Sequence, residues 1–170
     1  MKIWITTDTH MCHDKTIDFC SRPVDFNARI IRGLNDIKYG DVLIHLGDVA
    51  WRPEGERWYL GHLPCKKWLV KGNHDRSYTY HLDLGWDWIG ETMELERFGL
   101  RIKFSHKPVA IHEEDIQFHG HFHNAPREKW EDELKAILTE KHKLLVIEDM
   151  DYKPVPLETL IKKYGYKLEA

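Results

Sequence analysis

Histidine, aspartate and asparagine side chains occur in five short polar clusters that could hold metal ions. The chain has 12 histidines in 170 residues. In chain order, the clusters are Asp8-Thr9-His10, Gly47-Asp48, Gly72-Asn73-His74-Asp75, His106 and Gly120-His121-Phe122-His123. Imidazole and carboxylate ligands suit Zn, Mn, Fe, Co or Ni, whereas an all-oxygen set would suit Mg or Ca. The clusters therefore predict a transition-metal site.

The number of candidate ligands favours two metal ions over one, because six to seven such side chains exceed what a single ion needs. Asp48 is the candidate bridging ligand, since a carboxylate has two oxygens and Asp48 lies centrally in the series. Asp8, Asp48 and a bridging hydroxide would reduce the charge of two divalent ions to about +1. Such a centre would attract an anion and stabilise the negative charge that develops on a phosphoryl group under attack.

Short apolar runs bounded by turn residues predict the strands that position these clusters. The predicted strands cover residues 3–6, 42–46, 68–70, 102–105, 116–119 and 144–147. Apolar residues at helical spacing predict helices over 26–37 and 128–141. Apolar and polar residues alternate over 82–100, which indicates antiparallel strands within the otherwise parallel order. The predicted class is α/β.

Each polar cluster directly follows the carboxyl end of a predicted strand. In open α/β sheets ligands bind at this edge, because the strand ends bring distant parts of the sequence into one crevice. Asp8 and His10 stand two residues apart, and His121 and His123 repeat this spacing. Taken singly, these side chains could be polar strand-end caps, but together they predict one site.

Length and composition predict a single globular domain over residues 1–170. No stretch approaches the roughly 20 apolar residues of a membrane helix, and the first seven residues are too short and mixed for a signal peptide. We therefore expect a cytoplasmic protein without a membrane partner. Cys12, Cys20 and Cys65 lack a CxxC spacing and are expected to be reduced. A net charge of -3 disfavours a long nucleic acid as the partner.

The order of the motifs, DxH, GD, GNHD, a single His and GHxH, resembles that of the calcineurin-like metallophosphoesterases from Asp8 through His123. Residues 148–157 also resemble the tail of small stand-alone bacterial and phage members. The resemblance implies a four-layer αββα sandwich of two mixed sheets flanked by helices. It also implies two divalent transition-metal ions, with Mn preferred over Fe, Zn, Ni or Co, and hydrolysis of a phosphate ester by a hydroxide that bridges them.

The resemblance assigns a role to each motif residue. The first metal ion would be held by Asp8, His10, Asp48 and His123, and the second by Asp48, Asn73, His106 and His121. His74 would not be a ligand, because its counterpart in the family hydrogen-bonds the phosphate and protonates the leaving group.

Residues around these motifs could contact the substrate. Arg52 falls where phosphatases of the superfamily keep an Arg that clamps phosphate, but Trp51 replaces the Asp of their GDxxDRG motif, which orients the catalytic His. His13 follows the DxH loop by three residues and either reaches the substrate or lies on the surface. Trp51 and Trp58 could stack a nucleobase, although core packing explains most of the tryptophans. Asp75 is expected to stabilise a turn rather than to act in catalysis.

We expect hydrolysis of a small phosphate mono- or diester, with a nucleotide among the candidate substrates. A metal-dependent nuclease is the alternative enzyme, and the net charge of -3 and the lack of length for a second domain weigh against it. A catalytically silent binding scaffold is the alternative outside enzymes. Such relatives lose ligands or the catalytic His, whereas this sequence keeps them. The sequence makes no prediction of the oligomeric state.

Overall fold

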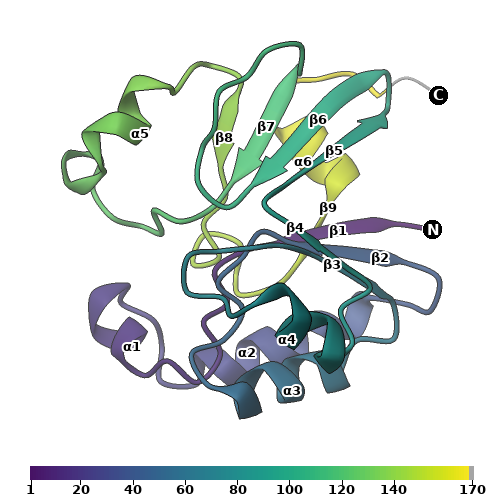
Figure 1. Ribbon diagram of the computed structural model, residues 1–170, viewed down its shortest axis with the longest axis vertical. Helices are drawn as coiled ribbons and strands as arrows, with labels where there is room; N and C mark the ends of the chain where they lie inside the picture. Colours follow the sequence, from purple (N-terminus) through teal and green to yellow (C-terminus); the bar gives the residue numbers. More distant parts are fainter. Residues whose placement is uncertain (169–170) are drawn as a thin grey trace.

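Two mixed β-sheets face each other in the computed structural model, which describes residues 1–168 (Figure 1). The first sheet has the order β4-β3-β2-β1-β9 and contains Trp88–Gly90, Lys66–Val70, Val42–His45, Ile3–Thr6 and Val155–Pro156. The second has the order β5-β6-β7-β8 and contains Thr92–Arg97, Leu100–Ser105, Ile116–His119 and His142–Leu144. Only β9 and β5 run antiparallel to their neighbours. This arrangement, with helices outside the sheets, confirms the predicted fold class.

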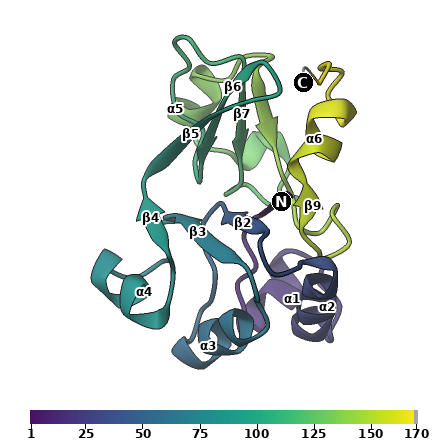
Figure 2. The same cartoon turned by 90° about the vertical axis from the view of Figure 1, so that its right-hand side faces the viewer.

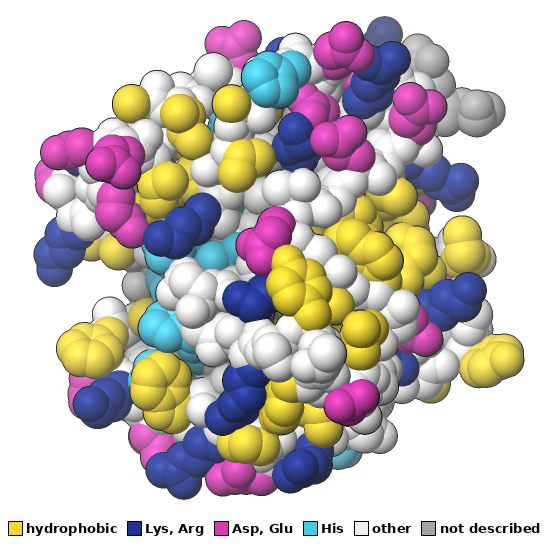
Figure 3. All heavy atoms as spheres, in the orientation of Figure 1, with side chains coloured by type: hydrophobic (Ala, Val, Ile, Leu, Met, Phe, Trp, Pro, Cys, Tyr) yellow, Lys and Arg dark blue, Asp and Glu magenta, His cyan; other side chains and the backbone are white. Residues whose placement is uncertain are grey.

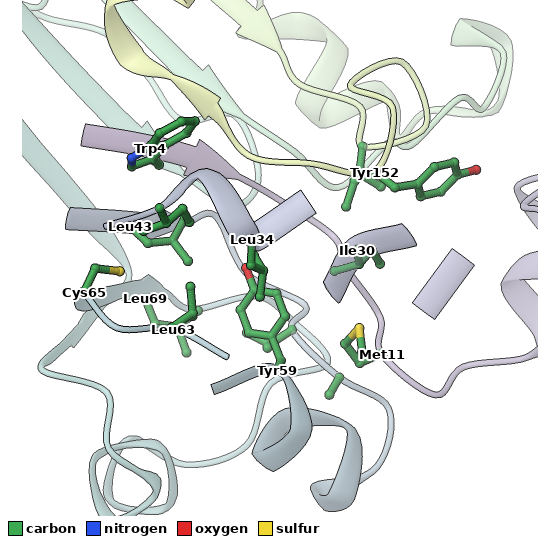
Figure 4. Close-up of a cluster of buried hydrophobic side chains, with 14 of the residues drawn as sticks. Trp4, Met11, Ile30, Leu34, Leu43, Tyr59, Leu63, Cys65, Leu69 and Tyr152 are labelled. Atoms are coloured by element: carbon green, nitrogen blue, oxygen red, sulfur yellow. The ribbon is translucent and has the colours of Figure 1, made fainter. Parts of the chain in front are cut away.

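Helices cover the outer face of the first sheet, where alternate side chains of the strands form a core with them (Figures 2 and 4). These helices are α2 (Phe26–Gly33), α3 (Pro53–Gly61) and α4 (Tyr78–Leu84). Trp4, Leu43 and Leu69 project from β1, β2 and β3 toward buried Ile30 of α2 and Tyr59 of α3. The predicted helix over 26–37 is confirmed for α2 and ends in a 3-10 turn, Leu34–Asp36.

The opposite faces of the two sheets share a second core. Ile5 and Ile44 from the first sheet lie in one buried cluster with Phe104 and Phe118 from the second. Helix α6 (Leu157–Lys163) adds Leu160 and other apolar side chains to this cluster. Burial of apolar surface from both sheets therefore fixes their relative position, on which the site between their loops depends.

Two predicted elements differ from the structure. The helix predicted over 128–141 is wrong over most of its length, because only a 3-10 turn, Arg127–Lys129, and the short helix α5, Asp132–Ala136, form there. Trp130 between them is extended and stacks on Phe122 with ring centroids 3.9 Å apart, so a tertiary contact replaces the helical continuation. Strand β8 begins and ends earlier than the predicted 144–147.

The remaining helix, α1, covers Lys15–Phe19 beside the first-strand loop. None of the helices among the described residues has both the length and the apolar character needed to cross a membrane.

Candidate metal centre

Five strands from the two sheets end at one edge of the molecule, and a predicted polar cluster follows each of them. Parallel β1 and β2 are in register to their last residues, Thr6 and His45, and β3 lies beside β2. In the second sheet, β6 and β7 are in register to Ser105 and His119. Figure 3 shows histidine side chains in a hollow between the two halves of the molecule on this side. The clusters thus lie where strand ends of both sheets meet.

The first group of candidate ligands contains Asp8, His10 and His123, whose ligand atoms all lie within 4.8 Å of one another. His123 Nε2 is 3.7 Å from Asp8 Oδ1, and the rings of His10 and His123 are 5.1 Å apart between centroids. Asp8 and His10 are buried, whereas His123 is partly exposed. Asp8 and His10 come from the loop after β1, and His123 comes from the loop after β7.

The second group surrounds His106 Nε2. This nitrogen lies 2.9 Å from Asn73 Oδ1, 3.4 Å from Asp48 Oδ2 and 3.3 Å from His121 Nδ1. The other ring nitrogen, Nδ1, donates to the Leu46 carbonyl oxygen at 2.8 Å, so Nε2 carries the lone pair. His121 Nε2 lies 3.2 Å from Glu131 Oε1 and donates to it, so His121 Nδ1 also carries a lone pair. Among the described residues, acceptor atoms therefore converge around His106 Nε2, which is unfavourable unless a cation lies among them.

Asp48 lies between the two groups. Its Oδ2 atom is 3.5 Å from His10 Nε2 and 3.4 Å from His106 Nε2, while Oδ1 accepts a hydrogen bond from the His74 backbone N–H at 2.9 Å. One carboxylate oxygen thus faces a histidine of each group. Asp8 Oδ1 also comes within 4.0 Å of His106 Nδ1, but that nitrogen is engaged with Leu46.

The electrostatics of the cluster also fit a cation. Burial raises the pKa of Asp48 to about 6, and the nearby His106 offsets this only in part. Burial acts on Asp8 in the same direction, but the histidines around it, His123 first, outweigh it and hold the Asp8 pKa below its ordinary value. Within residues 1–168, Asp8 Oδ1 and His10 Nδ1 are buried without a hydrogen-bond partner. A divalent ion would stabilise both carboxylates in the ionised form.

Backbone conformation at the site is strained. Several candidate ligands have φ in the left-handed region, namely Asp8 at 48°, His10 at 44°, Asp48 at 57°, His121 at 76° and His123 at 50°. Residues with side chains rarely adopt such angles, and strain of this kind concentrates at functional sites. Glycines of the motifs allow the loops to approach: a Cβ atom on Gly72 would overlap Asp48 Oδ1, and one on Gly120 would overlap Asp8 Oδ2.

Asp75 fixes the two loops that meet at Asp48. Its carboxylate accepts hydrogen bonds from the backbone N–H groups of Asp48, Val49 and Gly72 at 2.8, 3.0 and 2.8 Å. Asp75 therefore has the turn-stabilising role expected from the sequence.

His74, His13 and Arg52 lie around this centre. The exposed His74 ring is 5.6 Å from the His10 ring and 5.6 Å from the Trp51 ring, between centroids. His13 stacks on Trp51, and its ring is 5.5 Å from that of His10. Arg52 is exposed at the start of α3. The structure thus brings His74 and His13 beside the candidate ligands and leaves Arg52 on the adjoining surface.

Sequence reasoning missed Arg22 and Glu148 at this site. Glu148 Oε1 lies 3.4 Å from His123 Nδ1 and accepts a hydrogen bond from Arg22 Nε at 2.8 Å. Arg22 also donates to the carbonyl oxygens of Asp8 and Thr9. Glu148 begins the segment 148–157, which resembles the tail of small family members. This resemblance is the one feature of the sequence that points to Glu148. Arg22 carries no motif.

The fold and the converging acceptors define the chain as an α/β protein with groups of candidate metal-binding side chains between the loops of two mixed sheets. The chain also matches the family model described as calcineurin-like phosphoesterase over residues 1–168, and it belongs to that family. Membership supports the predicted metal-dependent phosphoester hydrolase class.

The chain is also similar to one curated protein and to two solved structures. An uncharacterised protein of Methanocaldococcus jannaschii is 26% identical over 174 residues, which cover 95% of this chain and 90% of that protein. A crystal structure of an Aquifex aeolicus protein of unknown function superposes with a TM-score of 0.74 at 28% identity and covers 95% of this chain and 98% of that one. A structure described as a novel archaeal phosphodiesterase gives a TM-score of 0.48 at 20% identity and 75% coverage of each chain.

Proposed function

We propose that the chain is a dinuclear metal-dependent phosphoesterase that hydrolyses a small phosphate mono- or diester. The observation that carries this proposal is the position of Asp48 Oδ2, which lies 3.5 Å from His10 Nε2 and 3.4 Å from His106 Nε2. A carboxylate between two groups of imidazoles is suited to bridge two cations.

The residues that would hold the ions are the set implied by the sequence. Asp8, His10, Asp48 and His123 would bind one ion, and Asp48, Asn73, His106 and His121 the other. When bound, two divalent ions of the Mn, Fe, Zn, Ni or Co type, with Mn preferred, would supply hydroxide at neutral pH and neutralise charge on the phosphoryl oxygens. Glu148 would orient His123, as carboxylates commonly do behind a metal-binding imidazole.

His74 is suited to protonate the leaving group. Its backbone N–H is bonded to Asp48 Oδ1, which fixes its place beside the centre, while its imidazole is exposed and available to a substrate. Arg52 and His13 are candidate substrate contacts on the same side. A nuclease stays the alternative enzyme, and a silent binding scaffold the alternative outside enzymes.

Metal content and turnover test this proposal. Protein purified without chelator should carry up to two transition-metal equivalents, and chelation should abolish turnover of a chromogenic phosphodiester or monoester until Mn is restored. Asp48→Asn should lower occupancy at both sites, whereas Asp25→Asn, an exposed carboxylate at the start of α2, should leave both the metal content and the rate unchanged.

Two results would contradict the proposal. Full activity of the metal-stripped protein would exclude the mechanism. Normal metal content and rate in Asp48→Asn would exclude the bridge. Comparison of short oligonucleotides with mononucleotide esters would separate the nuclease alternative, and loaded protein that turns over none of these esters would favour the scaffold.

A further inference from the structure

We propose that Trp51, supported by His13, forms a stacking platform for a flat aromatic ring carried by the leaving group, such as the base of a nucleoside or the ring of a phenol. We call these two residues the aromatic platform. The inference rests on the proposed function, because it names the class of substrate that the same site would take.

The two rings of the platform lie nearly parallel. Their centroids are 4.1 Å apart with an interplanar angle of 7°, so one face of the Trp51 indole is covered by His13. Trp51 nevertheless keeps 47% of its surface exposed. A large apolar ring that is left half in water beside the histidines of the site can gain free energy by stacking a second ring.

The backbone holds the platform in place. Met11 and Ala50 form an isolated parallel β-bridge, and the Trp51 N–H donates to the Met11 carbonyl oxygen at 3.0 Å. On the other side, Pro53 begins α3, and Gly55 of that helix packs so closely on Met11 that a Cβ atom there would be 2.9 Å from the Met11 oxygen. A platform fixed in this way loses little conformational entropy when a ring binds.

The position of His74 indicates that the aromatic platform lies beside the leaving group. The rings of Trp51 and His74 are 5.6 Å apart between centroids and inclined by 58°. A proton donor must reach the leaving-group oxygen, so the part of the substrate that carries this oxygen lies beside His74 and therefore beside Trp51. The platform would accordingly contact the leaving group, while the phosphoryl group lies toward Asp48.

One platform fits one ring, which favours a mononucleotide or aryl ester over a long strand. Proteins that bind single strands use several stacking side chains along a positively charged groove. The net charge of -3 gives no support for such a groove.

The experiment measures binding of matched phosphates to the Mn-loaded protein by calorimetry. The first pair is adenosine 5′-monophosphate and ribose 5-phosphate, which differ only in the base. The second is phenyl phosphate and cyclohexyl phosphate, which differ in flatness. Wild type should bind the aromatic member of at least one pair about tenfold more tightly, as one stacked base commonly contributes.

Trp51→Ala should bring the affinity ratio within the pair toward one, because it weakens the binding of the aromatic member alone. Trp51→Phe should retain part of the preference. The matched control is Trp58→Ala, since Trp58 is 42% exposed on α3 and, among the described residues, its ring pairs with none of the site histidines. It should leave the preference unchanged. Circular dichroism checks that each variant is folded.

The outcomes separate this inference from the proposed function. A preference in the nucleotide pair alone assigns the platform to nucleobases, and a preference in both pairs assigns it to flat rings in general. Equal binding within both pairs by wild type, or an equal loss for both members in Trp51→Ala, would overturn the platform. If turnover of a chromogenic ester is Mn-dependent in that case, the proposed function stands. If no ester is hydrolysed, the proposed function fails. The affinity ratios within the two pairs still show whether Trp51 binds aromatic rings.

Discussion

Arg22 Nε lies 2.8 Å from Glu148 Oε1 although 126 residues separate the two along the chain. Both side chains are buried, and Arg22 also binds the carbonyl oxygens of Asp8 and Thr9. The pair therefore joins the loop after the first strand to the segment that follows β8. Through Glu148 the pair also contacts His123, so one buried ion pair connects the C-terminal segment with the candidate metal centre.

Removal of Arg22 should be strongly destabilising. Arg22→Ala removes one partner of a buried ion pair, which commonly costs about 3–5 kcal/mol of unfolding free energy, and leaves the Glu148 carboxylate with His123 at 3.4 Å. The double variant Arg22→Ala, Glu148→Gln should recover part of this loss, because no uncompensated charge is left. Urea unfolding of the metal-free protein measures both effects.

The matched control for this experiment is Arg29→Ala. Arg29 forms an exposed ion pair with Asp25 at 2.8 Å, and exposed pairs contribute little to stability. If Arg22→Ala and Arg29→Ala shift the urea midpoint equally, the Arg22–Glu148 pair does not hold the loop and the tail together.

Gly72 should tolerate no side chain. A Cβ atom at this position would overlap Asp48 Oδ1, so Gly72→Ala should displace the proposed bridging carboxylate and cost about 1–3 kcal/mol through overpacking. The metal content of the purified variant should fall well below that of wild type. Gly61→Ala is the control, because the space around Gly61 is open. Wild-type metal content in Gly72→Ala would mean that the two loops move apart without affecting the site.

Local sequence patterns were sufficient to predict the strands that position the candidate ligands. Buried strands such as β1, β2 and β7 are short apolar runs, and a polar cluster follows each one directly. Once parallel pairing is assumed, the ends of such strands meet at one edge. Asp8, Asp48 and His121 could therefore be placed near one another before any distance was known.

Contacts between distant segments could not be predicted in this way. The helical pattern over 128–141 has the expected spacing, but stacking of Trp130 on Phe122 and the extended backbone at Trp130 interrupt it. The Arg22–Glu148 pair has no local signal, because an ion pair across 126 residues depends on the completed fold. The stacking of His13 on Trp51 likewise depends on the bridge between two loops.

His45 should make stability depend on pH between about 4 and 6.5. Its Nδ1 accepts the Gly47 N–H at 3.1 Å, and its Nε2 lies 2.9 Å from Thr9 Oγ1, so the fold holds the neutral ring. Burial lowers the pKa of His45 to about 4, below the value of about 6.5 for an unfolded chain. The unfolded state then binds more protons in this window, so the unfolding free energy falls as the pH falls.

The expected contribution is about 1.4 kcal/mol per pH unit, present in full above pH ~6.5 and lost toward pH ~4. Urea unfolding in the presence of chelator, for wild type and His45→Gln, measures it. The Gln variant should be less stable overall but should show a shallower pH dependence over this range, since other titrating groups are common to both proteins. Parallel profiles would show that the pKa of His45 is the same in the folded and unfolded states and would contradict the prediction.

His74 should affect the chemical step without affecting metal content. Its backbone N–H, rather than its imidazole, contacts Asp48, so His74→Gln keeps the hydrogen bond to Oδ1 and should retain both metal ions. If the imidazole supplies a proton, kcat should fall roughly 10² to 10⁴-fold on an ester with an alkoxide leaving group. The fall should be small on a nitrophenyl ester, because nitrophenolate leaves with little need of a proton.

The measurement compares kcat on an alkyl and a nitrophenyl phosphate for His74→Gln and for His62→Gln, an exposed histidine at the end of α3 that serves as the control. The control should leave both rates unchanged. An equal fall on the two esters in His74→Gln would assign His74 to positioning of the phosphoryl group, because positioning matters for both leaving groups alike. Loss of a metal ion from His74→Gln would instead place His74 among the ligands and contradict the proposed division of the histidines.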